Sequence, residues 1–321
     1  MTDNKINWGV LGYARIAKNW VIPAIENSKN STLYAIAAKD SERFNECKER
    51  YCNVKTYNNY EDLLSDPEVQ AVYIPLPNGL HKEWVIKAAR KGKHILCEKP
   101  ISLNSSECTE MIEECKRNGV KLMEAFMYRY THKIKKVMEL LSDNAIGEIK
   151  HIYSTFSFLL ERTSDYRWDP AQGGGALYDL GCYPINFIGM ILKSSPVSMT
   201  ANYVSRGDVD LRFSASLKYE NGITADISCG FDAHFNQLSQ ITGTNGSILI
   251  PDTFHDNAGK IILKTNQFTK EIDVEACERY LLEIEDFSDS IINNKEPYLG
   301  LDESLRNINI IEQLLLMTYK Q

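Results

Sequence analysis

Lys99 and Tyr183 are the two residues of this sequence whose types best suit proton chemistry. Lys99 directly follows the apolar run Ile95–Cys97, inside Glu98-Lys99-Pro100. Such a run predicts a buried parallel strand, and ligands bind in open α/β sheets just beyond the carboxyl ends of such strands. Lysines are also common in surface turns, so Lys99 becomes a catalytic candidate only if the fold places that strand in a binding sheet.

Tyr183 lies in a segment that begins with three consecutive glycines, Gly173 to Gly175, and continues to Pro184. Glycines ahead of a helix give a flexible backbone that suits an anion. Asp179 precedes Tyr183 by four residues, so the two side chains would share one face of a continuous helix, although Pro184 predicts a kink there. A core tyrosine and an ordinary charge at a helix start explain the pattern equally well.

The first predicted strand, Ile6–Leu11, leads directly into Gly12-Tyr13-Ala14-Arg15-Ile16-Ala17 and an amphipathic helix. Strand, turn and helix form the context of a dinucleotide fingerprint, although the pattern is Gly-x-Ala-x-x-Ala rather than the full glycine motif. Gly12 can form the tight turn, and Ala14 lets the backbone approach a pyrophosphate at the helix N-terminus. The cofactor-binding candidates here are Gly12, Tyr13, Ala14, Arg15 and Ile16.

The end of the second predicted strand, 32–38, bears on which dinucleotide is bound. An acidic residue at this point holds the ribose 2′-hydroxyl of NAD, whereas basic residues accommodate the 2′-phosphate of NADP. Lys39 and Arg43, with Ser41 as a hydroxyl donor, favour NADP, while Asp40 keeps NAD as an alternative. These residues would otherwise merely begin the next helix, with Ser41 as its N-cap.

A loop and several scattered side chains complete the set of candidates. The strand Ala71–Ile74 runs into Pro75-Leu76-Pro77-Asn78-Gly79-Leu80-His81, where two prolines force an extended loop. The further cofactor-side candidates are Pro75, Leu76, Asn78, His81 and Glu98, with His81 expected to anchor the loop rather than to catalyse. The substrate-side candidates, whose roles the sequence does not fix, are Met127, Arg129, Arg167, Trp168 and Asn236. For the two arginines, binding of a phosphate or carboxylate group and simple exposure to solvent are equally consistent with the sequence.

The hydrophobic patterns predict two different sheets. Alternating strands and helices from residue 6 to 123 predict an α/β domain with a doubly wound parallel sheet, and strands dominate after residue 123. Asn221-Gly222 and Asn245-Gly246 mark hairpins of a mainly antiparallel sheet. The strands predicted after residue 123 are 149–160, 198–203, 211–219, 224–229, 239–242 and 247–250, and the helices are 132–141, 176–192, 277–293 and 302–318. The predicted domains are 1–123, which binds the dinucleotide, and 124–321, which binds substrate and oligomerises, with the C-terminal helices free to pack back on the first domain.

Composition excludes several classes of protein. The 321 residues are 43% hydrophobic and 25% charged, which indicates a globular chain of two domains. The net charge of −7 and the dispersed basic residues argue against a nucleic-acid surface. The sequence shows no apolar leader and no apolar run of membrane length. Eight scattered cysteines without zinc-ligand spacing predict reduced thiols, no metal site and a cytoplasmic location.

Four motifs together resemble the Gfo/Idh/MocA oxidoreductases, the glucose–fructose oxidoreductase and inositol dehydrogenase family, over essentially the whole chain. They are Gly12-x-Ala14-x-x-Ala17, Pro75-Leu76-Pro77-Asn78-x-x-His81, Glu98-Lys99-Pro100 and Gly173-Gly174-Gly175-Ala176-x-x-Asp179-x-Gly181-x-Tyr183. The subgroup with tyrosine in the last position, where inositol dehydrogenases have histidine, contains dihydrodiol dehydrogenases, NADP-dependent xylose dehydrogenases and nucleotide-sugar 3-ketoreductases. Met127 stands where dihydrodiol dehydrogenases tend to carry tryptophan, which favours a sugar or polyol over an aromatic diol.

The resemblance implies a Rossmann domain followed by an α+β domain with an open-faced antiparallel sheet, and an active site between them. It implies that Lys99 and Tyr183 flank the reacting carbon over the nicotinamide of NADP or NAD, with Asp179 beside them. Hydride transfer at a CH–OH carbon needs a proton donor or acceptor at the substrate oxygen. A tyrosine with a pKa of about 10 is a poor base, and a nearby ammonium lowers that pKa. We therefore expect Tyr183 to be the acid/base, Lys99 its electrostatic partner, and Asp179 the residue that orients the substrate hydroxyl.

Two other functions remain open at this point. An NAD-dependent glycosidase of the same fold would hydrolyse a p-nitrophenyl glycoside without net change in NAD(P)H, and Tyr183 argues mildly against it. A non-catalytic dinucleotide sensor would bind the cofactor without turnover and would have no need for both Lys99 and Tyr183. We also expect a homodimer or homotetramer, because strands such as Ala215–Tyr219 and Ile223–Ile227 would leave an apolar sheet face to be covered.

Overall fold

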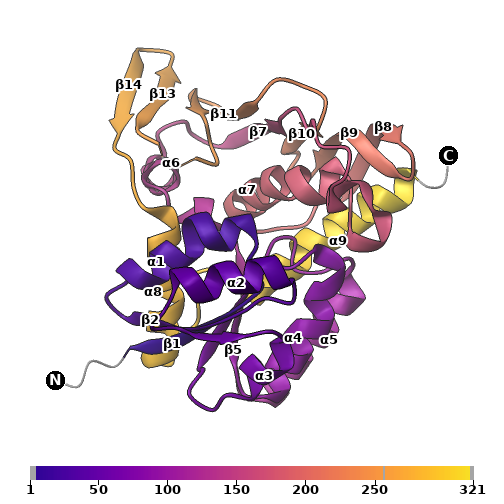
Figure 1. The fold of residues 1–321 in the computed structure, drawn as a ribbon. Helices are drawn as coiled ribbons and strands as arrows, with labels where there is room; N and C mark the ends of the chain where they lie inside the picture. The colour runs from indigo at the N-terminus through magenta and orange to yellow at the C-terminus, as the bar shows by residue number, and fades with distance from the viewer. Residues whose placement is uncertain (1–4, 256, 319–321) are drawn as a thin grey trace. The chain divides into compact units, whose positions relative to one another are not determined.

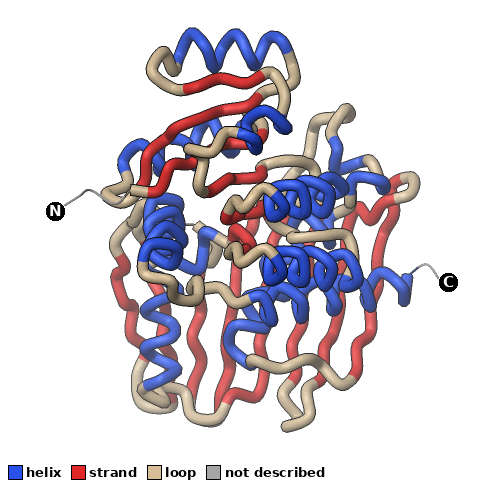
Figure 2. The backbone as a smooth tube through the Cα atoms, turned by 90° about the horizontal axis from the view of Figure 1, so that it is seen from below, coloured by secondary structure: helices blue, strands red, loops and turns tan. Residues whose placement is uncertain are grey.

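The computed structural model describes residues 5–255 and 257–318, which form two compact units. The first unit contains the described residues up to Phe126 and also Tyr280–Ser304, and the second contains Met127–Arg279 and the described residues from Leu305 onward. Each unit has its own sheet, six strands in the first and eight in the second (Figure 1; strands are red in Figure 2). The predicted α/β class with two different sheets is confirmed.

The sheet of the first unit is parallel throughout. Its strands are β1 (Ile6–Leu11), β2 (Ser31–Ala37), β3 (Lys55–Tyr57), β4 (Ala71–Ile74), β5 (His94–Glu98) and β6 (Leu122–Ala125). Their order is β3-β2-β1-β4-β5-β6, and neighbouring strands pair in parallel. The chain builds outward from β1 to β3 on one side and from β4 to β6 on the other, so the topological switch point lies between β1 and β4. Ligands of doubly wound sheets bind at this point, outside the carboxyl ends of the strands.

Some helices of the first unit begin at a side-chain cap. These helices are η1 (Ala17–Val21, a π-helical turn), α1 (Ile22–Asn27), α2 (Ser41–Arg50), α3 (Tyr60–Ser65), η2 (Asn78–Leu80), α4 (His81–Arg90), α5 (Ser105–Arg117) and α8 (Arg279–Ile292). Asn104 Oδ1 accepts a hydrogen bond from Glu107 N at 2.9 Å and caps α5. Asp40, not Ser41, caps α2, because its extended backbone places Oδ1 3.0 Å from Arg43 N. The alternative interpretation, in which Ser41 is the N-cap, is therefore wrong in its cap residue.

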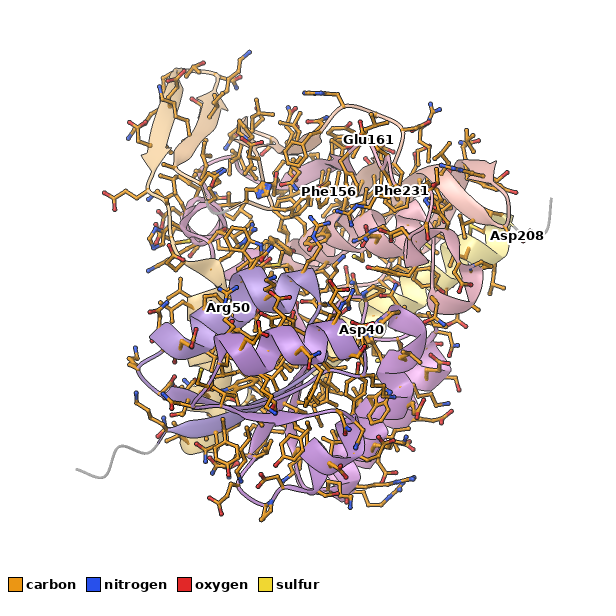
Figure 3. All side chains as sticks on the ribbon, viewed as in Figure 1. Asp40, Arg50, Phe156, Glu161, Asp208 and Phe231 are labelled. Atoms are coloured by element: carbon orange, nitrogen blue, oxygen red, sulfur yellow. The ribbon has the colours of Figure 1, made fainter. Side chains whose placement is uncertain are left out.

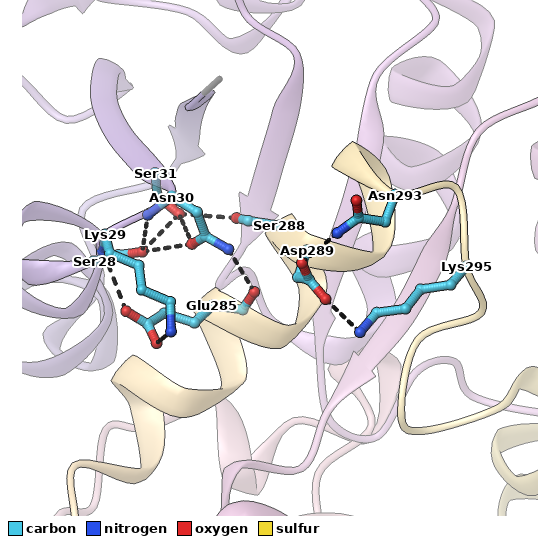
Figure 4. A network of polar contacts seen from close by, with 9 residues as sticks. All are labelled: Ser28, Lys29, Asn30, Ser31, Glu285, Ser288, Asp289, Asn293 and Lys295. Carbon is cyan, nitrogen blue, oxygen red and sulfur yellow. Dashed lines mark hydrogen bonds and ion pairs between the residues drawn. The ribbon is translucent and has the colours of Figure 1, made fainter. Parts of the chain in front are cut away.

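Helix α8 packs on the loop between α1 and β2, although it comes from near the end of the chain. Asn30 Nδ2 donates to the Glu285 carbonyl at 2.9 Å, and the hydroxyls of Ser31 and Ser288 lie 2.8 Å apart (Figure 4). The indole Nε1 of Trp8, inside β1, donates to Ser288 Oγ at 3.0 Å. These buried contacts attach α8 to the parallel sheet and explain why the first unit includes a distant segment of chain.

The sheet of the second unit is mainly antiparallel, as predicted. Its strands are β7 (Ile149–Ser157), β8 (Ser198–Arg206), β9 (Val209–Lys218), β10 (Thr224–Gly230), β11 (Asn236–Gly243), β12 (Gly246–Pro251), β13 (Gly259–Thr265) and β14 (Thr269–Val274). Their order is β14-β13-β12-β11-β7-β10-β9-β8. Strands β7 and β10 pair in parallel, and the other neighbouring pairs are antiparallel.

Strands β13 and β14 were not predicted. Strand β14 contains the charged residues Lys270, Glu271 and Asp273 and few apolar ones. Its side chains are largely exposed. Charged side chains are typical of an edge strand, where they oppose pairing with other chains, and they remove the apolar alternation on which the prediction depends. Strand β7 also ends at Ser157, earlier than the predicted 160, although the N–H groups of Phe158 and Leu160 still donate to the Gly230 and Phe231 carbonyls.

Helix α7 (Cys182–Leu192) covers this sheet, and its side chains are buried from Cys182 to Met190. The other helices of this part of the chain are η3 (Met127–Tyr130), α6 (His132–Ser142), η4 (Tyr166–Trp168), η5 (Pro170–Gln172), η6 (Leu177–Gly181, π-helical) and α9 (Leu301–Thr318). On β9, Ala215 and Leu217 are buried, whereas Ser214 and Ser216 are exposed. The expected open apolar face is therefore wrong at these strands, since their apolar side chains are covered and the outer ones are polar.

The cysteines lie mostly in the two cores. Six of the eight are buried, and none of the eight, all within the described ranges, is joined in a disulfide. Within residues 5–255 and 257–318, no helix combines the length and the apolar content needed to cross a membrane.

Candidate active site

Gly12 forms the turn after β1, beside the switch point of the parallel sheet. Its φ is +121°, a conformation that favours glycine. A Cβ at this position would lie 3.1 Å from Leu76 Cδ2 and 3.5 Å from Tyr60 Oη, so the turn passes close to the loop that follows β4. The missing side chain and the helix that begins directly afterwards fit a pyrophosphate held by backbone N–H groups. The residues present therefore suit a dinucleotide.

The residues that follow Gly12 in the fingerprint differ in how far their side chains are exposed. The side chain of Tyr13 is buried edge-to-face against Tyr51, with ring centres 6.3 Å apart, and burial raises its pKa. Tyr13 can therefore offer a cofactor little besides its backbone. Arg15 is exposed and Ala14 and Ile16 are half-buried, so the first turn of the helix remains accessible.

Lys39, Ser41 and Arg43 all lie just beyond the carboxyl end of β2, as a 2′-phosphate site requires. Lys39 Nζ lies 4.5 Å from the centre of the Tyr60 ring and 4.7 Å from that of Trp84, so two aromatic faces hold the ammonium. Ser41 and Arg43 are exposed on the first turn of α2. Asp40 (labelled in Figure 3) is occupied as the helix cap, which leaves its carboxylate less suited to a ribose hydroxyl.

Lys99 stands one residue beyond β5, in a turn that the neighbouring strand fixes. Tyr73 on β4 donates from Oη to Glu98 Oε1 at 2.5 Å, and Glu98 Oε2 accepts from Lys99 N at 3.2 Å. Burial raises the pKa of Tyr73 well above its usual value, so its hydroxyl stays protonated and remains a donor. Glu98, a cofactor-side candidate in the sequence, thus makes structural hydrogen bonds within this turn. The Lys99–Pro100 peptide bond is cis.

His81 joins the loop after β4 to the Lys99 turn. Its Nδ1 lies 2.9 Å from the Pro100 carbonyl oxygen and its Nε2 2.8 Å from that of Leu76. Burial lowers the pKa of His81, while the two carbonyl acceptors favour its protonated form. The prediction that His81 anchors this loop is consistent with both contacts, and Asn78, three residues earlier, is also buried.

Glu124 also holds the turn that contains Lys99, and this residue was not predicted from the sequence. It pairs with Cys97 across β5 and β6, and its Oε1 accepts from Ile101 N at 2.9 Å. The side chain is buried, and burial raises its pKa to about 7. An acidic residue inside the apolar strand Leu122–Ala125 was the available signal.

In the second unit, Tyr183 is held by aromatic rings near the start of α7. The ring centres of Phe156 and Phe254 both lie 5.3 Å from that of Tyr183, and Tyr128 lies 5.9 Å away (Phe156 is labelled in Figure 3). The Tyr183 hydroxyl lies 3.8 Å from Met127 Sδ, a weak acceptor. The structure thus brings the substrate-side candidate Met127 to the proposed acid/base.

Asp179 forms an ion pair with Arg167. Arg167 Nε donates to Asp179 Oδ2 at 2.6 Å and Nη2 donates to Oδ1 at 3.3 Å, while Nη1 donates to Asp165 Oδ1 at 3.2 Å. The neighbouring carboxylates raise the pKa of Arg167 against the opposing effect of its burial. Two predicted residues therefore meet, with Arg167 holding Asp179 rather than standing in solvent.

The helix that carries Asp179 and Tyr183 begins as the π-helical turn η6 and continues as α7. Pro184 has no N–H to donate, and the irregular turn ends at Gly181, just before the segment where the sequence predicts a kink. Both residues are nearly buried, with Asp179 4% and Tyr183 5% exposed. The helical irregularity thus falls where the chemistry is expected.

Three substrate-side candidates have structural partners. Arg129 is buried and donates from Nη1 to Asn186 Oδ1 at 3.4 Å. Trp168 donates from Nε1 to the Arg162 carbonyl at 2.7 Å, and its ring packs against Phe231. Asn236 is exposed at the first position of β11 and pairs through its backbone with Ser157. These contacts explain Arg129 and Trp168 without a substrate.

The family of the chain follows from comparisons with known proteins. Residues 6–126 match the family model described as "Oxidoreductase family, NAD-binding Rossmann fold", and residues 134–249 match the GFO/IDH/MocA C-terminal domain. D-xylose 1-dehydrogenase (NADP(+)) 2 of Haloferax volcanii is 33% identical over 96% of this chain and 95% of its own length. Trans-1,2-dihydrobenzene-1,2-diol dehydrogenase of Xenopus laevis is 32% identical over 76% of this chain and 74% of its own.

A solved structure agrees with these matches. The crystal structure of KijD10, a 3-ketoreductase from Actinomadura kijaniata in complex with NADP and TDP-benzene, superposes with a TM-score of 0.91. It is 27% identical and covers 98% of both chains.

The fold, the turn at Gly12 and the comparisons together define the class of this protein. The chain is an NAD(P)-dependent oxidoreductase that acts on CH–OH groups. It belongs to the Gfo/Idh/MocA family, as the four sequence motifs predict.

Proposed function

We propose that this chain is an NADP-preferring oxidoreductase that acts on a sugar, polyol or related keto-sugar. The observation that carries the proposal is the fixed Lys99 turn, which Tyr73, His81 and Glu124 hold at the carboxyl edge of the dinucleotide-binding sheet. A lysine in a loose surface turn would not need three buried side chains to hold the backbone on either side of it. The domain arrangement 1–123 and 124–321, with catalytic residues drawn from both, is part of the proposal.

The proposed chemistry assigns one step to each residue. The bound cofactor supplies the acceptor or donor of a hydride at the substrate carbon. Tyr183 takes the proton from the substrate hydroxyl during oxidation, or gives it back during reduction. Lys99 stabilises negative charge on the phenolic and substrate oxygens, and Asp179 accepts a hydrogen bond from a neighbouring substrate hydroxyl. The Arg167 ion pair keeps the carboxylate of Asp179 in one orientation.

Two lines of support favour a sugar or polyol. The Haloferax volcanii relative is a D-xylose 1-dehydrogenase and the Actinomadura kijaniata structure is that of a 3-ketoreductase. Met127, which contacts the Tyr183 hydroxyl, offers a thioether rather than the broad aromatic surface that would stack on an aromatic diol. A dihydrodiol substrate is therefore the less favoured alternative.

Two lines of support favour NADP. Lys39, Ser41 and Arg43 give the end of β2 two cations and a hydroxyl, while Asp40 is engaged as a cap. The Haloferax volcanii relative is named as NADP(+)-dependent, and KijD10 was crystallised with NADP. The other residues assigned to the cofactor are Gly12, Tyr13, Ala14, Arg15, Ile16, Pro75, Leu76, Asn78, His81 and Glu98.

A cofactor-resolved activity screen tests the proposal. The purified chain is assayed with NADP⁺ and NAD⁺ against aldoses, polyols and dihydrodiols, and with NADPH and NADH against keto-sugars, by nicotinamide absorbance. We expect turnover of a sugar or polyol with kcat/KM at least tenfold higher for the phosphorylated cofactor, and loss of at least 100-fold in Tyr183→Phe. Cofactor binding without any turnover would support the sensor instead. Hydrolysis of a p-nitrophenyl glycoside without net NAD(P)H change would support the glycosidase.

We also propose a homodimer or homotetramer in a cytoplasmic location. The outer face of β9 and β10 is polar, so association there would have to use hydrogen bonds and ion pairs rather than an apolar patch. Light scattering that gives the mass of a monomer would contradict the oligomer.

A further inference from the structure

A buried carboxylate, that of Asp210, sits at the beginning of the helix that carries Asp179 and Tyr183. Asp210 lies on β9, 33 positions away in sequence, and its Oδ2 accepts a hydrogen bond from Leu177 N at 2.7 Å. It also accepts from the N–H of Ala176. Only 6% of Asp210 is exposed. The first free N–H groups of this helix are thus satisfied by a residue from another element.

Gly175, the last glycine of the run Gly173–Gly175, makes room for this carboxylate. Gly175 has φ of +107°, and a Cβ there would lie 2.1 Å from Asp210 Oδ1. A Cβ on Gly174 would lie 2.6 Å from the Arg167 carbonyl oxygen. The anion that the glycine run was predicted to suit is therefore the chain's own Asp210. Any side chain at Gly175 would displace the carboxylate.

The helix start has no side-chain cap of its own. Ala176, the residue before η6, cannot cap, and η6 is a π-helical turn, which is less regular than an α-helical one. Asp179 is the third residue of η6, and Tyr183 is the second residue of α7. An anion at a helix N-terminus is favoured by the helix dipole as well as by the two hydrogen bonds. The position of Asp179 and Tyr183 along the helix axis therefore depends on the Asp210 carboxylate that caps the helix.

We propose that Asp210 is a positioning residue for the reaction, whose carboxylate fixes the first turn of the helix so that Asp179 and Tyr183 are held in reactive geometry. This inference rests on the proposed function of those two residues. Asp210 itself touches neither substrate nor cofactor in this role.

The surroundings of Asp210 are costly for a carboxylate, which argues against an incidental placement. Burial raises its pKa to about 7, and the N–H groups of Leu177 and Ala176 oppose that effect. The titratable groups that interact with the neighbouring Cys229 thiol on β10 are Asp210, Cys182 and Asp179. The groups that lower the pKa of Asp210 include the backbone N–H groups of Leu177 and Ala176, so the helix N-terminus compensates for the charge of this carboxylate.

The test compares Asp210→Asn with Asp208→Asn. Asparagine keeps the shape and one acceptor, but its NH₂ group faces a backbone N–H and cannot accept from it. Asp208 lies in the exposed turn between β8 and β9 (Figure 3), so its substitution removes the same charge two residues away without touching the helix. The measurements are kcat and KM with the best substrate of the screen, the Kd of NADPH from its fluorescence, and amide hydrogen exchange over residues 175–183.

We expect Asp210→Asn to lower kcat at least tenfold, to leave the Kd of NADPH within twofold, and to raise exchange over residues 175–183. Asp208→Asn should match the wild type in all three. An Asp210→Asn enzyme with wild-type kcat, beside an inactive Tyr183→Phe, would overturn this inference alone. A Tyr183→Phe enzyme with full activity would instead overturn the proposed function. Exchange in the wild type decides the matter if Asp210→Asn does not fold, because unprotected amides at Ala176 and Leu177 would mean that no such cap exists.

Discussion

Arg167 and Asp179 form a two-point ion pair, with Nε 2.6 Å from Oδ2 and Nη2 3.3 Å from Oδ1. Arg167 precedes the glycine run and Asp179 follows it, so the pair closes that loop. Asp179 is 6% exposed in its side chain and Arg167 26%, which makes this contact less screened than a surface pair. The carboxylate proposed to orient the substrate is therefore oriented by the chain before any substrate arrives.

Arg167→Met should destabilise the protein and impair binding of substrate. The change leaves a nearly buried carboxylate without its charged donors, and hydrogen bonds to charged groups contribute about 1.5–3 kcal/mol each. We expect the free energy of unfolding to fall by about 2 kcal/mol or more and KM to rise. Arg212→Met is the matched control, because Arg212 pairs with Asp232 at 2.9 Å on the exposed side of the sheet. Equal effects in the two variants, measured by denaturation, would contradict the special role of Arg167.

Lys99→Met should abolish most turnover while the fold persists. Removal of a charge that stabilises a developing oxyanion lowers kcat by about 10²–10³. The turn itself should survive, since Tyr73, His81 and Glu124 hold it through Glu98 and the backbone. Lys91→Met, at an exposed position before β5, serves as the control. Near-normal kcat in Lys99→Met would remove Lys99 from the mechanism.

Gly12→Ala should weaken cofactor binding more than its backbone strain explains. Alanine at φ of +121° is strained, and its Cβ would contact Leu76 and Tyr60 where the dinucleotide approaches. Gly92→Ala separates the two effects, because Gly92 has φ of +69° and open space around a new Cβ. We expect both variants to lose about 1–2 kcal/mol of stability, and only Gly12→Ala to raise the Kd of NADPH at least tenfold. Isothermal titration gives the Kd of NADPH, and equal values for the two variants would contradict the proposal that the dinucleotide passes close to Gly12.

Lys39→Ala should reduce the preference for NADP over NAD. Loss of an ammonium that contacts a phosphate should raise the KM for NADP⁺ by about tenfold, because a charge-assisted hydrogen bond contributes roughly 1.5 kcal/mol or more. The KM for NAD⁺ should hardly change. Lys87→Ala is a close control, since Lys87 Nζ also lies over the Trp84 ring, at 4.1 Å, but on α4. A parallel rise for both cofactors would indicate a general packing defect instead.

Glu124→Gln should alter how stability depends on pH. Burial raises the pKa of Glu124 from 4.5 to about 7, so the folded state holds this proton more tightly than the unfolded state does. The resulting stabilisation is complete below about pH 4.5 and is lost as the pH rises through about 7. Glutamine stays neutral, so its stability relative to the wild type should increase from pH 5 to pH 8, by on the order of 3 kcal/mol at most.

Urea denaturation of both proteins at several pH values measures this difference. A difference in stability that is constant from pH 5 to pH 8 would show that Glu124 is ionised throughout. Glu139→Gln controls for charge, since Glu139 is a surface residue paired with Lys136 and its pKa is lowered rather than raised.

Local pattern was enough to predict several parts of this protein. The tight turn at Gly12 after an apolar strand was predicted correctly because the backbone conformation there depends on the few residues around it. The same holds for the parallel sheet of the first unit, since alternating strands and helices with short connections leave few topologies open, although the order of its strands came only from the structure. The prediction failed where two local signals compete, as at Asp40 and Ser41, or where an edge strand such as β14 lacks apolar alternation.

The sequence by itself determined the fold class, the family and the residue types available for hydride and proton chemistry. Only the tertiary structure decided how those residues are held. Asp210 reaches the helix start at Leu177 from 33 positions away, and Glu124 reaches Ile101 in the Lys99 turn from 23 positions away. The sequence around each of these two acids does not identify its partners. A buried carboxylate is stable only beside N–H donors, and the folded chain brings those donors from distant segments.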